Sequence, residues 1–398
     1  MKNYKYLIIG GGMTADSAVI GIREIDPEGS IGLISIESDP PYDRPPLSKG
    51  LWKGKPLDSI WRKTESRHVA LHLGTKIVSL NADEQSVRDD QGNAYHGEVL
   101  LLATGGRPRR LDFGGEAVLY FRTLDDYRRL EKMSKAVQSF AVIGGGFIGA
   151  ELAAALAMNG KKVSMLFPED GIGARMYPHD LSQFITDYFR KKGVEIFPGE
   201  QVTELSPQGK RHVLKTQSGQ DVVVDGVIAG IGIELNLELA KAAGLRVGNG
   251  ISVDEHLLTS HPNIYAAGDV AEFFNPALGQ RLRLEHEDAA NTMGIQAGRN
   301  MAGASEPYLH LPFFYSDLFE LGYEAVGQLD SRLTTVADWA EPFQKGVVYY
   351  LKDDRVSGVL LWNVWDKVPD ARKLIAQPGP FKAEDLKAKN GPGWKIAF

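Results

Sequence analysis

The sequence predicts an α/β protein in which a parallel-strand unit occurs twice and a smaller α+β domain with an antiparallel sheet follows. Residues 4–36 and 139–167 each contain a buried strand, a run of three glycines, an apolar helix and a second strand. Each unit later continues into a hairpin that closes on glycines. From about residue 305, alternating stretches typical of antiparallel strands replace this plan.

Apolar runs and glycine turns define the elements of both units. The first unit is expected to contain a strand over 4–9, glycines 10–12, a helix to about 25, a strand over 31–36 and a hairpin over 87–102. The second is expected to contain a strand over 139–143, glycines 144–146, a helix over 147–158, a strand over 163–167 and a hairpin over 213–228. A further helix over 181–189 has apolar residues at helical spacing and is expected to face the core.

The C-terminal part is expected to contain strands over 345–352 and 356–362 and a helix over 368–375. The tail after Pro378 is rich in Pro, Gly and Lys and is expected to be loosely ordered. The expected domains are a discontinuous first domain over 1–123 and 252–304, a second over 124–251, and the α+β domain over 305–398.

Both glycine runs match the fingerprint of a dinucleotide-binding loop. The first glycine permits a tight turn, the second lets a pyrophosphate approach the backbone, and the third position lets helix and strand pack closely. The helix N-terminus then presents unpaired N–H groups to the phosphates. One match alone is weak, but two in equivalent positions predict two Rossmann-like domains. The matches are Gly10-x-Gly12-x-x-Ala15 and Gly144-x-Gly146-x-x-Gly149.

An acid follows each loop by about 25 residues, at the end of the second strand, where a ribose hydroxyl is bound in this fold. These acids are Glu37 and Glu169. Glu169, in place of an arginine, favours NADH over NADPH, although Arg175 nearby weakens that preference. Either acid alone could instead be a solvated strand end.

The composition restricts the chemistry. The chain has no cysteine, which excludes disulfides, thiolate-ligated zinc, iron–sulfur clusters and dithiol relays held by this chain, so redox work requires a bound cofactor. No metal is expected. The formal charge of -6 argues against nucleic acid as the main partner. No stretch approaches the roughly 20 apolar residues needed to span a membrane, and a cytoplasmic location is expected.

Two short segments add polar groups to this plan. Residues 40–49 contain four prolines, so Arg44 and Lys49 would be held with little entropy to lose. Such a fixed lysine could stabilise negative charge that develops on a flavin. Asp269 ends the apolar strand 264–267 and could accept hydrogen bonds from a polyol chain or cap a helix.

These motifs together resemble the flavin-dependent ferredoxin reductase family of pyridine nucleotide oxidoreductases. The segments that carry the resemblance are PYDRPPLSK at 41–49, ATGG at 103–106, IGGGFIGAEL at 143–152, AAGD at 266–269 and RLEH at 283–286. The C-terminal third is most similar to the apoptosis-inducing factor group within this family, through residues 314–317, 322–327 and 361–373.

The resemblance implies hydride transfer from NADH to FAD. Lys49 and Glu151 would form a pair near the flavin, Phe147 would gate the nicotinamide, and His286 would lie beside the isoalloxazine. The residues implied for FAD and its surroundings are Gly10, Gly12, Met13, Thr14, Ala15, Glu37, Arg44, Lys49, Val78, Thr104, Gly105, Arg122, Asp269, Glu285, His286 and Tyr315. Those implied for NADH are Gly144, Gly146, Phe147, Ile148, Gly149, Glu151, Glu169, Arg175, Gly232 and Glu324.

Three interpretations of the activity stay open. The first is a NADH oxidoreductase similar to apoptosis-inducing factor, with an unidentified acceptor such as a small redox protein, a quinone or oxygen. The second is a reductase for a rubredoxin- or ferredoxin-type iron–sulfur carrier, which a basic face formed by Lys49, Lys53, Lys55, Arg62 and Lys63 would favour. The third is a redox sensor that forms a homodimer on nucleotide binding, for which Trp61 matches a residue linked to rearrangement. Tyr315 departs from the tryptophan that the family usually carries.

Overall fold

The computed structural model describes residues 1–387 and divides into two compact units. Unit 1 comprises Met1–Arg44, Leu57–Arg107 and Glu234–Pro312, and unit 2 comprises Pro45–Pro56, Pro108–Ile233 and the chain from Phe313 onward. Each unit contains one of the two predicted glycine loops. The predicted α/β class is confirmed.

The main sheet of unit 1 has the order β3-β2-β1-β6-β5-β4, with β18 paired to β6. The ladders that join β3, β2, β1, β6 and β18 are parallel, whereas β4, β5 and β6 are antiparallel. The strands are β1 (Lys2–Ile9), β2 (Ile31–Ile34), β3 (Val69–His72), β4 (Ile77–Asn81), β5 (Ser86–Asp89), β6 (Ala94–Leu102) and β18 (Ile264–Ala266). The predicted 87–102 hairpin is therefore formed by β5 and β6.

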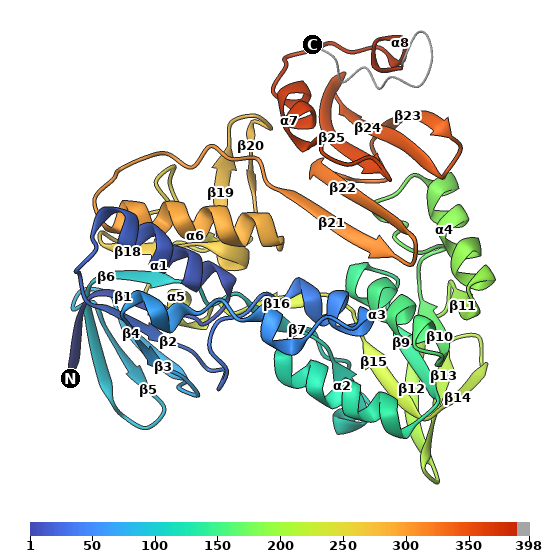
Figure 1. Cartoon of the computed structure of the whole chain (residues 1–398), viewed down its shortest axis with the longest axis horizontal. Helices are drawn as coiled ribbons and strands as arrows, with labels where there is room; N and C mark the ends of the chain where they lie inside the picture. Colours follow the sequence, from blue (N-terminus) through green and yellow to red (C-terminus); the bar gives the residue numbers. More distant parts are fainter. Residues whose placement is uncertain (388–398) are drawn as a thin grey trace. The chain divides into compact units, whose positions relative to one another are not determined.

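Two helices lie side by side against this sheet, α1 (Met13–Ile25) and α6 (Glu287–Met301) (Figure 1). They approach closely because α6 carries glycine at the crossing: a Cβ at Gly298 would lie 2.1 Å from the carbonyl oxygen of Ala18. Unit 1 also contains α5 (Glu238–Ala242), β17 (Ile251–Ser252), β19 (Ala271–Asn275) and β20 (Gln280–Leu282). A two-stranded sheet pairs β7 (Gly106–Pro108) with β16 (Ile233–Leu235).

Unit 2 contains a second parallel sheet, of order β11-β10-β9-β15-β8. Its strands are β8 (Val118–Tyr120), β9 (Ser139–Ile143), β10 (Lys162–Phe167), β11 (Val194–Pro198) and β15 (Gly226–Ala229). The helices of this part are α2 (Leu124–Ala136), α3 (Phe147–Met158) and α4 (His179–Lys191). Helix α3 has the predicted bounds, and α4 contains the predicted helix over 181–189.

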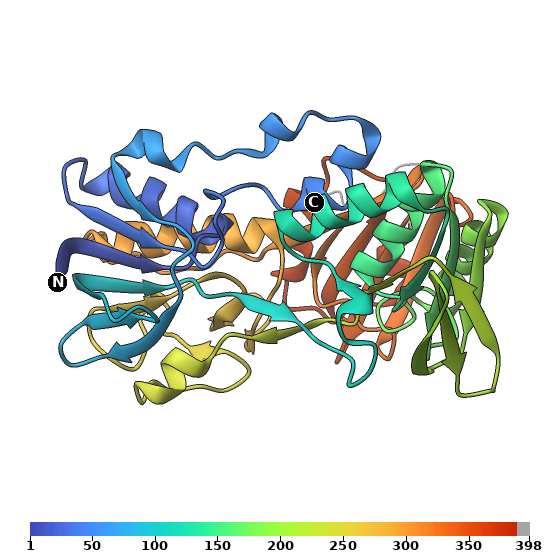
Figure 2. The same cartoon turned by 90° about the horizontal axis from the view of Figure 1, so that it is seen from below.

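The predicted hairpin over 213–228 is divided between two sheets. Strands β12 (Val202–Gln208), β13 (Arg211–Thr216) and β14 (Asp221–Val224) form a separate antiparallel sheet, drawn in yellow-green in Figure 2, whereas β15 joins the parallel sheet. Asp225 occupies the corner between them. Its carboxylate accepts hydrogen bonds from the Ser139 hydroxyl at 2.7 Å and the Ser139 amide at 2.9 Å, which fixes the bend. These bonds lower the pKa of Asp225.

Helix α4 contacts the C-terminal sheet of unit 2 as well as the parallel sheet. Leu181, Ile185 and Phe189 are fully buried, as predicted. The Phe184 ring stacks on Phe343 with ring centroids 5.2 Å apart. Edge-to-face and stacked aromatic pairs of this kind contribute about 0.5–1.5 kcal/mol beyond their buried area.

The C-terminal sheet is antiparallel throughout and has the order β21-β22-β25-β24-β23. Its strands are β21 (Phe313–Leu318), β22 (Leu321–Gly327), β23 (Thr334–Glu341), β24 (Lys345–Lys352) and β25 (Arg355–Trp362). Helix α7 (Val368–Ile375) packs on β22 and β25 (Figure 1). The expectation for the tail is wrong in part, because α8 (Ala383–Leu386) forms there and buries Leu386. Residues 388–398 of that tail lie outside the described chain.

Candidate nucleotide-binding sites

The first glycine loop joins β1 to α1 and has one strained and one open glycine. Gly10 has a φ of 131°, and a Cβ there would lie 2.1 Å from the carbonyl oxygen of Ala103. Gly12 caps α1, and a Cβ there would meet only the Arg44 side chain, at 3.8 Å, among the described residues. Gly10 is therefore required by the turn itself, whereas the space over Gly12 is open for a ligand. Met13, Thr14 and Ala15 follow, buried in the first turn of α1.

Three of the residues expected around FAD interact beyond the carboxyl ends of two parallel strands, Glu37 and Arg44 after β2 and Asp269 after β18. Glu37 binds Arg44 (Oε1 to Nη2, 2.6 Å), and Tyr42 donates its hydroxyl to Glu37 Oε2 at 2.5 Å. Burial opposes the charge of Arg44, but Glu37, Tyr42 and Asp269 outweigh it and raise the pKa of the guanidinium. Glu37, Arg44 and Asp269 thus form one electrostatic cluster in unit 1. Sequence reasoning missed Tyr42, which lies in the expected segment but carries no motif of its own.

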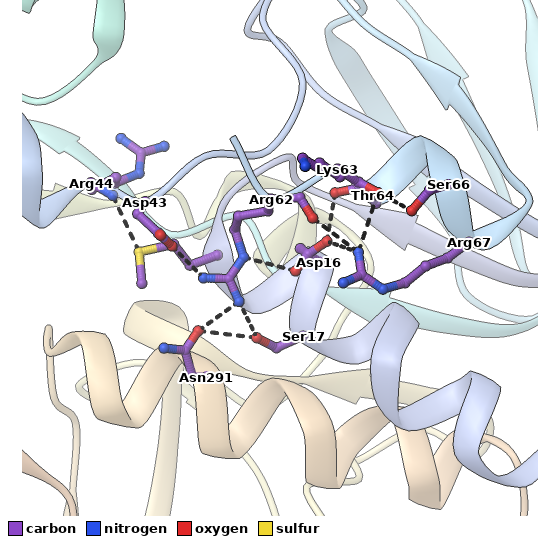
Figure 3. Close-up of polar contacts among 11 residues, drawn as sticks. Asp16, Ser17, Asp43, Arg44, Arg62, Lys63, Thr64, Ser66, Arg67 and Asn291 are labelled. Carbon is purple, nitrogen blue, oxygen red and sulfur yellow. Dashed lines mark hydrogen bonds and ion pairs between the residues drawn. The ribbon is translucent and has the colours of Figure 1, made fainter. Parts of the chain in front are cut away.

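A buried ion-pair network attaches the chain around Asp43 and Arg62 to helix α1 (Figure 3). Asp16 is 1% exposed, and its carboxylate binds Arg62 Nε at 2.7 Å and Arg67 Nη1 at 3.0 Å. Arg62 also donates from Nη1 to Asp43 Oδ1 at 2.6 Å. Because Asp43 precedes Arg44, the network fixes the backbone that presents Arg44 to Glu37.

Arg62 also links α1 to α6. Its Nη2 donates to Ser17 Oγ and to Asn291 Oδ1, both at 3.0 Å. The structure therefore corrects the expected basic face, because two of its five residues, Arg62 and Lys49, are ion-paired with carboxylates. The Arg62 side chain is largely buried and donates its hydrogen bonds to groups of unit 1. The Lys49 ammonium binds a buried carboxylate of unit 2.

Removal of the Asp16 carboxylate is expected to destabilise the protein strongly. In Asp16→Ala, the Arg62 and Arg67 guanidinium groups lose their shared partner inside unit 1, and breaking a buried pair in this way costs about 3–5 kcal/mol. Chemical denaturation should show this loss in the free energy of unfolding. Asp125→Asn is the matched control, because Asp125 forms an exposed pair with Arg128 and should change stability by less than about 1 kcal/mol. A loss below about 1 kcal/mol in Asp16→Ala would contradict the role given to the network.

Further residues expected around FAD lie after β6, on β4 and before α2. Thr104 donates to the Asn236 carbonyl at 2.9 Å, and Gly105 has a φ of 57°. Val78 lies half exposed on β4, in the segment that follows Gly74, whose amide donates to the Glu37 carbonyl at 2.9 Å. In unit 2, Arg122 directly precedes the capping box of α2.

Glu285 and His286 directly precede α6. Glu285 binds Arg283 at 2.8 Å, and His286 is the N-cap residue of the helix. Burial lowers the pKa of His286 to about 4, although Asp269 and Asp288 act in the opposite direction. The imidazole is therefore neutral near pH 7 and can offer one donor and one acceptor.

The second glycine loop repeats the geometry of the first. Gly144 has a φ of 115°, and a Cβ there would lie 2.4 Å from the carbonyl oxygen of Gly230. A Cβ at Gly149 would lie 2.1 Å from the carbonyl oxygen of Gly144, so the third position also requires glycine. A Cβ at Gly146, by contrast, would meet nothing within 4 Å in the described part of the chain. As at Gly12, the open position is the one where the fingerprint places a pyrophosphate.

Polar and aromatic groups surround this second loop. Phe147 and Ile148 begin α3 partly exposed, and the Phe147 ring packs edge-to-face on Phe314 at 5.4 Å. Glu169 follows β10 and binds Arg175 at 2.5 Å, while the Arg175 side chain stays 85% exposed. Gly232, also expected around NADH, follows β15 and has a φ of 93°.

Glu151 is the centre of a buried polar cluster. Its carboxylate binds Lys49 Nζ (Oε1, 2.7 Å) and accepts hydrogen bonds from Ser316 Oγ (Oε1, 2.6 Å) and Ser48 Oγ (Oε2, 2.6 Å). Lys49 Nζ lies 5.2 Å from the centroid of the Tyr315 ring. The sequence indicated Lys49, Glu151 and Tyr315, but missed the two serines. Each serine neighbours a predicted residue, and that was the one available signal.

Glu324 lies on the same sheet as this cluster, directly across the β21–β22 ladder from Tyr315. Burial, and then Asp366, raise the pKa of Glu324. Its Oε2 is buried and has no hydrogen-bond partner among the described residues. Burial also raises the pKa of Tyr177 and Tyr323, with Glu151 adding to the effect, so both hydroxyls stay neutral.

Comparison with known proteins gives matches over almost the whole chain. Residues 4–294 match the family model described as pyridine nucleotide-disulphide oxidoreductase, and residues 297–342 and 340–377 match that of the apoptosis-inducing factor C-terminal domain. The mitochondrial apoptosis-inducing factor 1 of Dictyostelium discoideum is 33% identical over 94% of this chain and 79% of that protein. The ferredoxin–NAD(+) reductase component of the Burkholderia cepacia anthranilate 1,2-dioxygenase system is 33% identical over 96% and 97%.

Solved structures agree with these sequence matches. The reductase in a covalent putidaredoxin reductase–putidaredoxin complex superposes with a TM-score of 0.87 at 30% identity, over 94% of both chains. A ferredoxin reductase of Rhodopseudomonas palustris gives a TM-score of 0.88 at 29% identity, over 96% of both chains. Within residues 1–387, no helix is long and apolar enough to cross a membrane.

Proposed function

The chain belongs to the pyridine nucleotide-disulphide oxidoreductase family and is a FAD-dependent NADH oxidoreductase, and from this premise we propose that it reduces a small iron–sulfur carrier protein. The observation that carries the assignment of cofactors is the pair of open glycines, Gly12 and Gly146, each at the start of a helix after a parallel strand. The chain has no cysteine, so the dithiol chemistry of the family's disulphide reductases is not available to it.

We assign the two cofactors to the two loops. FAD is held in unit 1 by Gly10–Ala15, with its adenosine ribose on Glu37 and its pyrophosphate facing the α1 N-terminus. NADH is held in unit 2 over Gly144–Gly149, with Glu169 on its ribose. The expected division into domains over 1–123 with 252–304, 124–251 and 305–398 belongs to this proposal, as does a cytoplasmic location.

Bound FAD supplies the capacity to take a hydride from NADH and to release electrons outward. The protein orients and polarises the reacting groups. Lys49, held by Glu151, provides a fixed positive charge close to the Tyr315 ring, and such a preorganised charge stabilises the negative charge that develops on a flavin. Glu324, with an unused acceptor among the described residues, and Phe147 are the further groups that we place near the nicotinamide.

An iron–sulfur carrier is favoured because several relatives that match at least 95% of this chain are named as ferredoxin reductases. The test is an anaerobic titration of the FAD-loaded protein with NADH, followed by addition of a [2Fe–2S] ferredoxin, a quinone, cytochrome c or air. Rapid reoxidation by the ferredoxin alone is the expected result. Failure of NADH to bleach the flavin would contradict the activity itself, and rapid reoxidation by a quinone alone would contradict the acceptor.

A NADH-dependent redox sensor is the second candidate, because residues 297–377 match the apoptosis-inducing factor C-terminal domain. In that case every acceptor should reoxidise the flavin slowly, and NADH should convert monomer to dimer. Gel filtration with and without NADH under anaerobic conditions distinguishes this candidate from the carrier reductase.

Glu169 is expected to set the preference for NADH. Its carboxylate repels a 2′-phosphate, and in Glu169→Ala the exposed Arg175 loses its partner and becomes available to that phosphate. The ratio of kcat/KM for NADPH to that for NADH should rise at least about tenfold, which corresponds to about 1.4 kcal/mol. Asp170→Asn is the matched control, because this neighbouring acid is exposed and binds His179 instead. An unchanged ratio in Glu169→Ala would remove Glu169 from the ribose site.

A further inference from the structure

Residues from two distant parts of the chain surround the Glu151 carboxylate and its Lys49 partner. Ser48 and Lys49 come from the turn after the proline-rich segment, and Tyr315 and Ser316 come from β21. All of these residues belong to unit 2. The Glu151 residue is 4% exposed, so its carboxylate is surrounded by these groups rather than by water.

Both serine hydroxyls donate their hydrogen bond to the Glu151 carboxylate. Ser48 donates to Oε2, while Ser316 and Lys49 share Oε1. Hydrogen bonds to ionised groups are short and about twice as strong as neutral ones, and they fix the plane of the carboxylate. With one oxygen anchored on each side, Glu151 cannot rotate about its terminal bond without losing at least one donor.

The orientation of Glu151 determines where Lys49 lies. The Lys49 ammonium bonds Oε1 on one side and faces the Tyr315 ring on the other. Lysine has a long flexible stem, so its position depends on the groups that hold its head. Strand β21 is the edge strand of its sheet and packs against α3, which places both Ser316 and Tyr315 at this cluster.

Neither serine hydroxyl is needed to complete the backbone structure. The backbone of Ser316 pairs with Tyr323 in the β21–β22 ladder without help from its side chain. Ser357, on β25 of the same sheet, shows the alternative, because its hydroxyl donates to the Tyr350 carbonyl rather than to a charged group.

We propose that Ser48 and Ser316 are positioning residues for hydride transfer, which fix the Glu151 carboxylate and through it the Lys49 ammonium. This inference rests on the proposed function, since it concerns the same site. It makes the C-terminal sheet part of the reaction machinery, because β21 supplies a donor to the charged pair as well as a ring beside it.

The test is a set of double-mutant cycles on the FAD-loaded protein. Flavin reduction by NADH is followed by stopped flow, and the visible spectrum and the FAD dissociation constant are measured without NADH. Ser316→Ala and Ser48→Ala should each slow the limiting rate of flavin reduction about tenfold, as expected for loss of a hydrogen bond to a buried charge. The flavin spectrum should shift, because Lys49 moves, while the FAD dissociation constant should change less than about twofold.

The cycles show whether the serines act through Glu151. In a Glu151→Gln background, Ser316→Ala and Ser48→Ala should each slow the reaction by less than about twofold, because coupled groups are not additive. Ser316→Thr keeps the hydroxyl and should recover most of the rate. Ser357→Ala, the matched buried serine, should leave the rate and the spectrum unchanged. Melting curves identify any variant that fails to fold, and Ser316→Thr then carries the comparison.

Three results would overturn the inference. These are an unchanged rate in both single alanine variants, an equal loss in the wild-type and Glu151→Gln backgrounds, and an equal loss in Ser357→Ala. If NADH does not reduce the flavin of the wild-type protein, the proposed function fails instead, and the unchanged or shifted flavin spectrum of Ser316→Ala still tests the positioning of Lys49.

Discussion

Substitution of Gly146 by alanine is expected to weaken NADH binding by about thirtyfold while leaving the fold and FAD binding intact. Within residues 1–387, nothing lies within 4 Å of the added Cβ, and the glycine has an ordinary negative φ of -84°, so the free protein should accept the methyl group. The methyl group would instead occupy the space that the pyrophosphate needs. Overpacking of this kind costs about 2 kcal/mol, and that energy corresponds to roughly thirtyfold in affinity.

Gly12→Ala is the matched variant in the other loop. It has similarly open surroundings and a φ of -88°, so it should lower FAD affinity and spare NADH binding. Fluorescence titration of each variant with each dinucleotide, together with thermal melting, measures these effects. If Gly146→Ala lowered the affinity for FAD and Gly12→Ala that for NADH, the assignment of the two loops would be reversed. Equal affinities in wild type and both variants would contradict dinucleotide binding at these loops.

Neutralisation of the Lys49–Glu151 pair is expected to slow flavin reduction about a hundredfold, which is the effect of one preorganised charge at a transition state. Lys49→Met and Glu151→Gln should both show it. They should differ in stability, because Lys49→Met leaves the buried Glu151 carboxylate without its cation, whereas Glu151→Gln leaves a neutral amide whose oxygen can accept from one serine hydroxyl and whose NH2 group can donate to the other.

The double variant Lys49→Met/Glu151→Gln separates the two contributions. It should recover most of the stability lost in Lys49→Met, since no uncompensated charge stays buried, but it should recover none of the rate. Stopped-flow reduction and chemical denaturation are the measurements. A double variant that reduced its flavin at the wild-type rate would show that the pair is structural and has no part in hydride transfer.

Local patterns predicted the elements that flank the two glycine loops because those elements depend on short-range interactions. A buried strand, a turn that only glycine can adopt and an apolar helix can be recognised within about 25 residues, and β9 and α3, which flank the second loop, have the predicted bounds. The division of the 213–228 hairpin could not be predicted in this way. It depends on the Asp225 carboxylate and its donors at Ser139, which lie 86 residues away in the chain.

Sequence also could not show which cations are exposed and which are paired. By composition Arg62 resembled a surface cation, and only the folded chain brings Asp16, Asp43 and Asn291 around it. Charge counts along a segment do not show which cations are exposed, because pairing depends on contacts that are distant in sequence. A carrier protein would therefore have to be recognised without Arg62 and Lys49.

By itself, the sequence determined that the protein has two loops with the fingerprint of dinucleotide binding, an acid after each loop at the spacing of a ribose-binding residue, and no thiol chemistry. The loops and acids follow from residue types at fixed local spacings, which a dinucleotide-binding fold requires, and the lack of thiol chemistry follows from the lack of cysteine. Only the tertiary structure decided which glycines are open to a ligand, which cations are buried, and that two serines hold Glu151. Those properties depend on distances between side chains that are far apart in the sequence, and hydrogen bonds and ion pairs are effective only over a few ångströms.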